Sequence, residues 1–164
     1  MRRRAAYMLL ALALVAPLPG AAQLDPEEHE IRSRVEARRD EMVSLLERWA
    51  GMNTGTWNRP GLEAFAALLA PALTELGFEV ESESPQLVYP GRGRVTMGPL
   101  LVARRPGPPE GGQRFLLVGH YDTVFEPDSP FQTYRVDPDD PGLAIGPGVA
   151  DMKGGLVVLL YALR

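Results

Sequence analysis

The amino-acid sequence predicts an α/β fold in which helices cover buried strands. Apolar residues recur at helical spacing over residues 31–49 and again over residues 62–76. Residues 115–118 form a short, continuous apolar run, which is typical of a strand covered on both faces. Helices that flank such strands indicate an α/β sandwich.

Residues 1–22 are expected to form a signal peptide that is not part of the fold. Arg2, Arg3 and Arg4 provide a positive start, residues 7–16 are an uncharged apolar run, and Gly20-Ala21-Ala22 offers small residues for cleavage. The run is shorter than the roughly 20 residues that span a bilayer, and an uncleaved membrane anchor is the alternative. The sequence therefore predicts an exported protein, periplasmic or secreted, with no stable membrane association after cleavage.

The remaining chain is acidic and contains no cysteine. Loss of the three N-terminal arginines moves the net charge from −4 to about −7. This balance argues against a nucleic-acid partner, because phosphate binding needs clustered Lys and Arg. The absence of cysteine excludes disulfides and zinc–thiolate sites. The length suits one domain, residues 23–164, with a sizeable core.

Two helices are predicted ahead of the strands. After a loose polar segment, residues 24–30, the first helix begins at Ile31 and ends before Gly51. The second covers about residues 61–76 and ends at Gly77, a good C-terminal cap. Pro71 is expected to kink or split this helix, because it removes a backbone donor.

Strands are predicted at three places, and a last helix follows them. Residues 78–81 alternate in polarity, residues 100–103 are apolar, and residues 115–119 contain the continuous apolar run. A Pro/Gly turn region at residues 106–112 separates the last two strands. Beyond a tight loop at Gly146 to Gly148, the apolar residues 156–163 predict a buried helix.

The first candidate site segment is Gly119–Phe125, directly after the predicted buried strand. A histidine here, His120, is aimed at the crevice where open α/β sheets bind ligands. Asp122, two residues later, can accept the second N–H of the imidazole and so fix its tautomer, as carboxylates do beside metal-bound histidines. Taken alone, the pattern His-x-Asp more often marks a locally bonded histidine and a turn-forming aspartate.

The second segment is Gly146–Gly155, which leads into the last helix. Asp151 lies between a glycine-rich turn and the helix start, where small residues allow a ligand to approach the backbone. The alternatives are an ordinary N-cap aspartate and, for Lys153, a plain surface charge. The presence of both segments in one chain favours a shared site.

Together, Gly119–Phe125 and Gly146–Gly155 resemble the paired metal signature of the M20 metallopeptidases, near the glutamate carboxypeptidase branch. Asn53–Thr56 and Glu126–Phe131 are similar to other parts of that family, so the resemblance covers roughly residues 31–164. It implies a three-layer α/β/α sandwich of the zinc-dependent exopeptidase type. This chain would be the N-terminal part of the catalytic domain, without the family's lid domain.

The resemblance implies roles for three residues. His120 and Asp151 would be metal ligands, with Asp151 bridging two zinc ions, and the catalytic role of orienting the histidine would fall to Asp122. Cobalt or manganese would also suit a histidine and carboxylate set. The resemblance further implies a cis peptide bond between Asp151 and Met152.

The implied activity is hydrolysis of an amide bond by a water molecule that two zinc ions activate. The enzyme would be a carboxypeptidase or an N-acyl amino acid deacylase, acting on small peptides or N-acyl amino acids, and a homodimer would form through the lid domain. The family's general base and remaining ligands would follow Arg164. Residues 1–164 alone are therefore expected to be inactive, to expose a sheet edge and to aggregate.

Two other interpretations stay open. An M28-type aminopeptidase also has a His-x-Asp pattern and a later bridging aspartate, but Thr123 and Met152–Gly155 favour the M20 pattern. A non-catalytic exported binding module that retains the scaffold would carry the same motifs.

Overall fold

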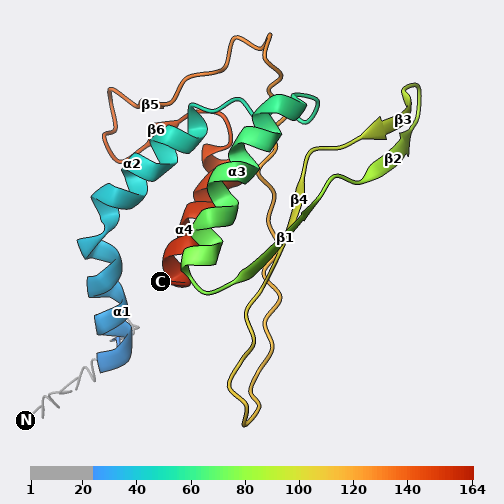
Figure 1. The fold of residues 1–164 in the computed structure, drawn as a ribbon. Coiled ribbons are helices and arrows are strands. Elements are labelled where there is room, and N and C mark those ends of the chain that lie inside the picture. The colour runs from blue at the N-terminus through green and yellow to red at the C-terminus, as the bar shows by residue number, and fades with distance from the viewer. Residues whose placement is uncertain (1–23) are drawn as a thin grey trace, which may run out of the picture.

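The computed structural model describes residues 24–164 of the chain (Figure 1). The predicted signal peptide lies outside the described residues. Within residues 24–164, no helix has both the length and the apolar character that crossing a membrane requires.

In chain order, helices stand at both ends of the described residues and short strands lie between them. This order confirms a mixed α/β fold. The helices are α1 (Pro26–Ala37), α2 (Arg39–Ala50), α3 (Arg59–Glu75) and α4 (Gly154–Ala162), with a distorted turn η1 (Val149–Lys153) directly before α4. The strands are β1 (Glu79–Glu83), β2 (Gln86–Tyr89), β3 (Gly93–Thr96), β4 (Leu100–Arg104), β5 (Arg135–Val136) and β6 (Ala144–Ile145). In space, the strands β1 to β4 lie to one side of the helices (Figure 1).

The N-terminal region contains two helices where one was predicted. Helix α1 begins at Pro26, because Asp25 and Glu28 form a reciprocal capping box in which each side chain accepts a hydrogen bond from the other's backbone N–H. The prediction of a loose polar segment at residues 24–30 is therefore wrong. At Arg38 the backbone leaves the helical region, with φ −109° and ψ 5°, and α2 begins at the next residue. Helix α1 buries no side chain.

Helix α3 continues through Pro71 without splitting. Pro71 and Ala67, whose carbonyl loses its helical donor, both lie on the exposed side of the helix. Water can satisfy that carbonyl, so the proline costs less there than in a buried turn. The predicted end of the helix is confirmed, because Gly77 adopts a left-handed backbone with φ +82°.

The strands form three separate antiparallel pairs, β1 with β4, β2 with β3 and β5 with β6. Strands β1 and β4 were predicted, and they pair so that Val80 lies opposite Ala103. The β2–β3 hairpin was missed, although Pro90-Gly91 between two runs of β-forming residues is a turn signal. Because the described strands do not join into one sheet, the structure shows a mixed α/β fold without three clear layers.

The strand predicted at residues 115–119 is wrong, since this segment has no regular structure. A strand requires a neighbouring backbone to complete its hydrogen bonds, and no described segment pairs with this one. The apolar run is largely exposed as a result. The exposed fractions are 80% for Phe115, 87% for Leu116, 56% for Leu117 and 77% for Val118.

The hydrophobic core lies between α2, α3 and α4, which pack together (Figure 1). Trp49 at the end of α2 meets Phe65 of α3 edge to face, with ring centroids 5.1 Å apart. Helix α4 contributes Leu156, Val157 and Leu160, all buried. This core fixes the end of α2 against the start of α4, and both of these ends lead into the candidate site.

Candidate metal centre

The structure brings His120, Asp122 and Asp151 together. The Nδ1 atom of His120 lies 3.1 Å from Oδ1 of Asp122 and 3.2 Å from that residue's carbonyl oxygen. The Nε2 atom of the same ring lies 2.9 Å from Oδ1 of Asp151. One imidazole therefore has a carboxylate at each nitrogen, from segments 31 positions apart.

Tyr121 explains why His120 and Asp122 point the same way. In an extended segment alternate side chains point to opposite sides, and Tyr121 points into the core. Its ring stacks on Phe65 with centroids 5.3 Å apart, and its hydroxyl donates a hydrogen bond to the carbonyl of Pro99. Burial, aided by the charge of Asp122, raises the pKa of Tyr121 to about 12, so the hydroxyl stays a donor.

The segment that links α2 to α3 runs parallel to the His120 segment and holds it by backbone bonds. The N–H of Thr123 donates to the carbonyl of Thr54 over 2.8 Å, and the N–H of Thr56 donates to the carbonyl of Thr123 over 3.0 Å. The hydroxyl of Thr54, which is fully buried, donates to the carbonyl of Tyr121 over 2.6 Å. These bonds fix the backbone of residues 121–123, on which Asp122 is carried.

Asp151 lies in the turn η1, where it has extended backbone angles of φ −136° and ψ 94°. Helix α4 begins three residues later, so the N-cap alternative for Asp151 does not hold. The Asp151–Met152 peptide bond is cis, which confirms that prediction. The turn is crowded, because a Cβ added at Gly154 would collide with the carbonyl oxygen of Val149.

Lys153 is fully buried, so the surface-charge alternative for this residue is wrong. Its ammonium group donates to the carbonyls of Trp49, over 2.9 Å, and Met52, over 2.7 Å, and lies 5.3 Å from the ring centroid of Phe65. Burial lowers the pKa of Lys153 to about 8. The lysine thus ties the segment that carries Asp151 to the end of α2.

The electrostatics of the site favour a positive charge at His120. Partial burial opposes that charge, but the hydrogen bond to Asp151 and the interactions with Asp122 outweigh it and raise the pKa of His120. The side chain of Asp151 is 87% exposed, whereas that of Asp122 is 38% exposed. The Nδ1 side of the ring is therefore the enclosed side, and the Nε2 side faces water.

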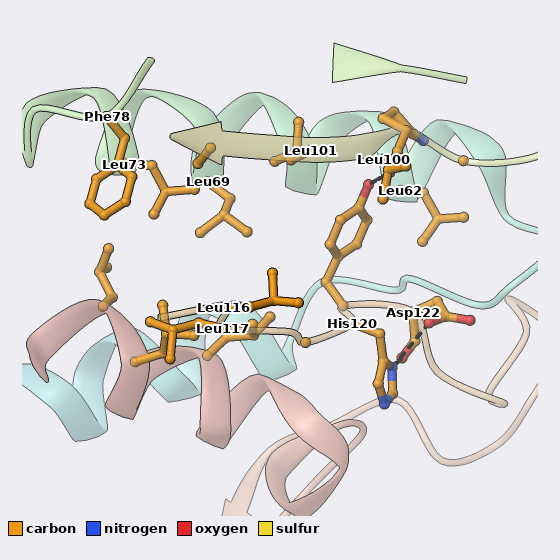
Figure 2. Close-up of a pocket in the computed structure, with 18 of the residues that line it drawn as sticks. Leu62, Leu69, Leu73, Phe78, Leu100, Leu101, Leu116, Leu117, His120 and Asp122 are labelled. Carbon is orange, nitrogen blue, oxygen red and sulfur yellow. Dashed lines mark hydrogen bonds and ion pairs between the residues drawn. The ribbon is translucent and has the colours of Figure 1, made fainter. Parts of the chain in front are cut away.

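Two cavities meet at these residues. One, of about 320 Å³, is lined by His120, Asp122 and Asp151 together with Phe125 and Phe131. The other, of about 470 Å³, is apolar and opens beside His120 and Asp122. Figure 2 shows leucines from α3 and β4 on one wall of this second cavity and Leu116 and Leu117 on the opposite wall.

The metal-binding atoms at this site are of the kinds that a metal ion accepts, but they are fewer than a complete site needs. An imidazole nitrogen and a carboxylate oxygen are ligands that zinc accepts, and catalytic zinc sites usually have three protein ligands. Among residues 24–164, no group of three or more His, Cys, Asp or Glu side chains is arranged to hold a metal. His120 and Asp151 would supply two ligands.

Sequence reasoning missed the residues that support the site. Thr54 and Thr56 belong to the segment Asn53–Thr56, for which the sequence indicated a similarity to the family but no role, and a surface charge was the alternative given for Lys153. A lysine that precedes two glycines and an apolar helix was the available signal for Lys153, because the surrounding residues offer little exposed surface. For the threonines the sequence offers no comparable signal, since their partners lie 66 and 67 positions away.

Comparison with known proteins places this arrangement in a family of hydrolases. Residues 116–164, which include His120, Asp122 and Asp151, match the model of peptidase family M20/M25/M40. The chain is 32% identical over 167 residues to carboxypeptidase G2 of Pseudomonas sp. (strain RS-16), covering 99% of this chain and 36% of that protein. It is 27% identical over 146 residues to the N-formyl-4-amino-5-aminomethyl-2-methylpyrimidine deformylase of Bacillus subtilis (strain 168), covering 86% of this chain and 32% of that protein.

A solved structure also has a similar fold. The crystal structure of human carnosine dipeptidase 1 matches 82% of this chain and 30% of its own, with a TM-score of 0.63 and 21% identity. At this level of identity the match shows that the two chains share a fold over the matched residues. The chain belongs to the M20 peptidase family, which is generally zinc-dependent, and the M28 alternative falls away. It spans about a third of the length of the curated relatives it matches.

Proposed function

We propose that this chain carries part of the metal centre of an enzyme that hydrolyses amide bonds. In this proposal His120, through Nε2, and Asp151 are metal ligands, and Asp122 holds the imidazole by its Nδ1 atom. The observation that carries the proposal is the approach of Nε2 of His120 to Oδ1 of Asp151, at 2.9 Å. Metal-bound histidines characteristically present one nitrogen to the metal and the other to a carboxylate.

The chemistry follows from the residues at hand. A divalent metal held by His120 and Asp151 would supply the means to lower the pKa of a water molecule and to polarise a carbonyl group. The carboxylate of Asp122 accepts a hydrogen bond from Nδ1–H of His120, which leaves the lone pair of Nε2 free for a ligand bond. The side chain of Asp151 is 87% exposed, so both of its carboxylate oxygens would be accessible to a metal. In this proposal the remaining ligands and the general base are supplied by residues other than 24–164, arranged with these in a three-layer sandwich.

The proposed substrates are small peptides or N-acyl amino acids. Carboxypeptidase and deformylase, the names of the two curated relatives, both denote hydrolases of a bond between an acyl carbon and nitrogen. The cavity beside His120, Asp122 and Asp151 has an aromatic wall of Phe125 and Phe131, whose ring centroids are 4.8 Å apart. An apolar side chain or acyl group would fit against this wall.

The test is hydrolysis of N-acyl amino acids and dipeptides by the protein as its gene encodes it, assayed after chelation and again after addition of Zn²⁺. The expected result is activity that needs the metal and is lost in His120→Ala and in Asp151→Asn. His29→Ala is the matched control, because His29 lies on the exposed helix α1 and makes no contact with the site. Zinc binding without any hydrolysis would indicate the non-catalytic module instead.

Residues 1–164 by themselves are expected to be inactive, since the described residues gather two ligands and no third. Metal-dependent hydrolysis by residues 1–164 alone, lost in His120→Ala, would contradict this expectation.

We also propose that the protein is exported to the periplasm or secreted. The support is the pattern of residues 1–22, with three arginines, an apolar run and Gly20-Ala21-Ala22. Sequencing of the N-terminus of the protein recovered from its source should begin near Gln23. An N-terminus at Met1 in the cytosol would overturn the proposal.

A further inference from the structure

The side chain of Thr56 contacts Asp122 at the carboxylate oxygen that His120 does not use. The Oγ1 atom of Thr56 donates a hydrogen bond to Oδ2 of Asp122 over 2.7 Å, while Oδ1 of Asp122 lies 3.1 Å from Nδ1 of His120. A 2.7 Å bond from a hydroxyl to a carboxylate is of the charge-assisted kind. With one oxygen held by Thr56, the carboxylate cannot rotate without losing this bond.

Thr56 is itself held in place. Its backbone N–H donates to the carbonyl of Thr123 over 3.0 Å, and the neighbouring Gly55 forms a parallel bridge with Thr123. The hydroxyl also lies 3.2 Å from the carbonyl of Thr123, a longer and uncharged alternative. Because a β-branched side chain has few accessible rotamers, the hydroxyl has little freedom to leave Asp122.

Gly55 makes this close packing possible. A Cβ added at Gly55 would lie 2.6 Å from Oε2 of Glu126 and 2.9 Å from its Cα atom. The carboxylate of Glu126 accepts a hydrogen bond from the N–H of Trp57 over 3.0 Å. Glu126 therefore also holds the turn that carries Thr56, through its close approach to Gly55 and its hydrogen bond from Trp57.

The two carboxylates at the imidazole differ in how firmly they are held. Asp122 has a hydroxyl donor on its second oxygen, and its side chain is 38% exposed. The carboxylate of Asp151 has no hydrogen-bond partner other than His120 among residues 24–164, and the side chain is 87% exposed. The firmly held carboxylate favours the tautomer with the proton on Nδ1, because a fixed acceptor keeps its bond while an exposed one exchanges with water.

We propose that Thr56 is a positioning residue that acts on His120 through Asp122. By fixing the carboxylate it keeps the ring proton on Nδ1 and leaves Nε2 as the acceptor. The role rests on the proposed function, in which Nε2 of His120 binds metal. It goes beyond that function by assigning the selection of the tautomer to a residue outside the two motif segments.

The first test measures the tautomer of His120 in the metal-free protein by ¹⁵N NMR, at a pH where the imidazole is neutral. The protein as its gene encodes it is used, and His120→Gln identifies the signals of His120, while His29→Gln identifies those of His29 on the exposed helix α1 as an internal reference. Thr56→Val is expected to lower the ratio of the Nδ1–H to the Nε2–H tautomer about fivefold, the effect of one ordinary hydrogen bond. Thr56→Ser, which keeps the hydroxyl, should restore the ratio.

The second test measures Zn²⁺ affinity by competition with a chelator. Thr56→Val should weaken binding about three- to tenfold, less than the roughly 10–100-fold loss typical of residues that contact a ligand histidine directly. Thr74→Val is the control, since the hydroxyl of Thr74 bonds only within α3, to the carbonyl of Ala70. It should leave the affinity unchanged.

The outcomes separate this inference from the proposed function. If the protein neither binds zinc nor hydrolyses amides, the tautomer shift still tests Thr56 by itself. An unchanged tautomer ratio in Thr56→Val, or an equal change in Thr56→Ser, would overturn the inference. Thr56→Ala provides a second variant without the hydroxyl, and unfolding of both Thr56→Val and Thr56→Ala would show that the residue is merely structural.

Discussion

The ammonium group of Lys153 donates a hydrogen bond to the carbonyl oxygen of Met52 over 2.7 Å, across 101 positions of sequence. A second bond, to the carbonyl of Trp49, places the same charge at the C-terminal end of α2. Carbonyls at this end of a helix lack helical donors and carry partial negative charge. The stretch from Trp49 to Thr56 therefore holds both halves of the site, Asp151 through Lys153 and Asp122 through Thr56.

Lys153→Met is expected to destabilise the protein by about 2 kcal/mol. It removes the donor of the part-buried Met52 carbonyl, and it leaves the Trp49 carbonyl with only the 3.2 Å bond from the N–H of Met52. Thermal or urea unfolding measures the loss, and Arg48→Met on the exposed side of α2 is the control. The zinc affinity should fall as well, since η1 would lose its tie to α2. A variant as stable as the wild type would show that burial of the charge costs as much as its hydrogen bonds contribute.

Asp122→Asn should lower the zinc affinity about 10–100-fold without unfolding the protein. The amide keeps the shape of the side chain, but it loses the charge that holds Nδ1 of His120 and the hydroxyl of Thr56. Chelator competition provides the measurement. Asp128→Asn, in an exposed loop, is the control, and an equal loss in both variants would argue against a specific role for Asp122.

Gly154→Ala should cost about 3 kcal/mol of stability, at the upper end for overpacked sites. The added Cβ would collide with the backbone carbonyl of Val149, which cannot move without opening η1. Gly107→Ala is a matched control, because a Cβ there meets no atom within 4 Å. Urea unfolding of the two variants compares them, and similar midpoints would mean that the turn can relax.

The exposed apolar run at residues 115–118 should make residues 24–164 aggregate when expressed alone. Leu116 and Val118 are 87% and 77% exposed, and such a segment is a template for pairing with other chains. Leu116→Lys with Val118→Lys should raise the soluble fraction and lower light scattering. Ile31→Lys on α1 is the control for a single exposed apolar residue, and it should have little effect. A soluble monomer with a sharp, cooperative melt before any substitution would contradict the prediction.

Short sequence patterns correctly predicted the helices and strands that depend mainly on residues close in sequence. The stripe of apolar residues on α3, the left-handed Gly77 after it and the alternation in β1 all depend on near neighbours, and all were confirmed. The same patterns failed at residues 115–118. An apolar run indicates a covered strand only if other segments cover it, and no described segment does so.

The sequence by itself determined the family and the residues that approach one another in the site, because His120, Asp122 and Asp151 lie in two short motifs whose residue types and spacing are specific. The tertiary structure alone decided how these residues are held. The donor to Asp122 is a threonine 66 positions away, and the acceptors of Lys153 are backbone carbonyls about 100 positions away. A carbonyl has no signature in sequence, and a hydroxyl acquires a partner only when packing places the two groups together.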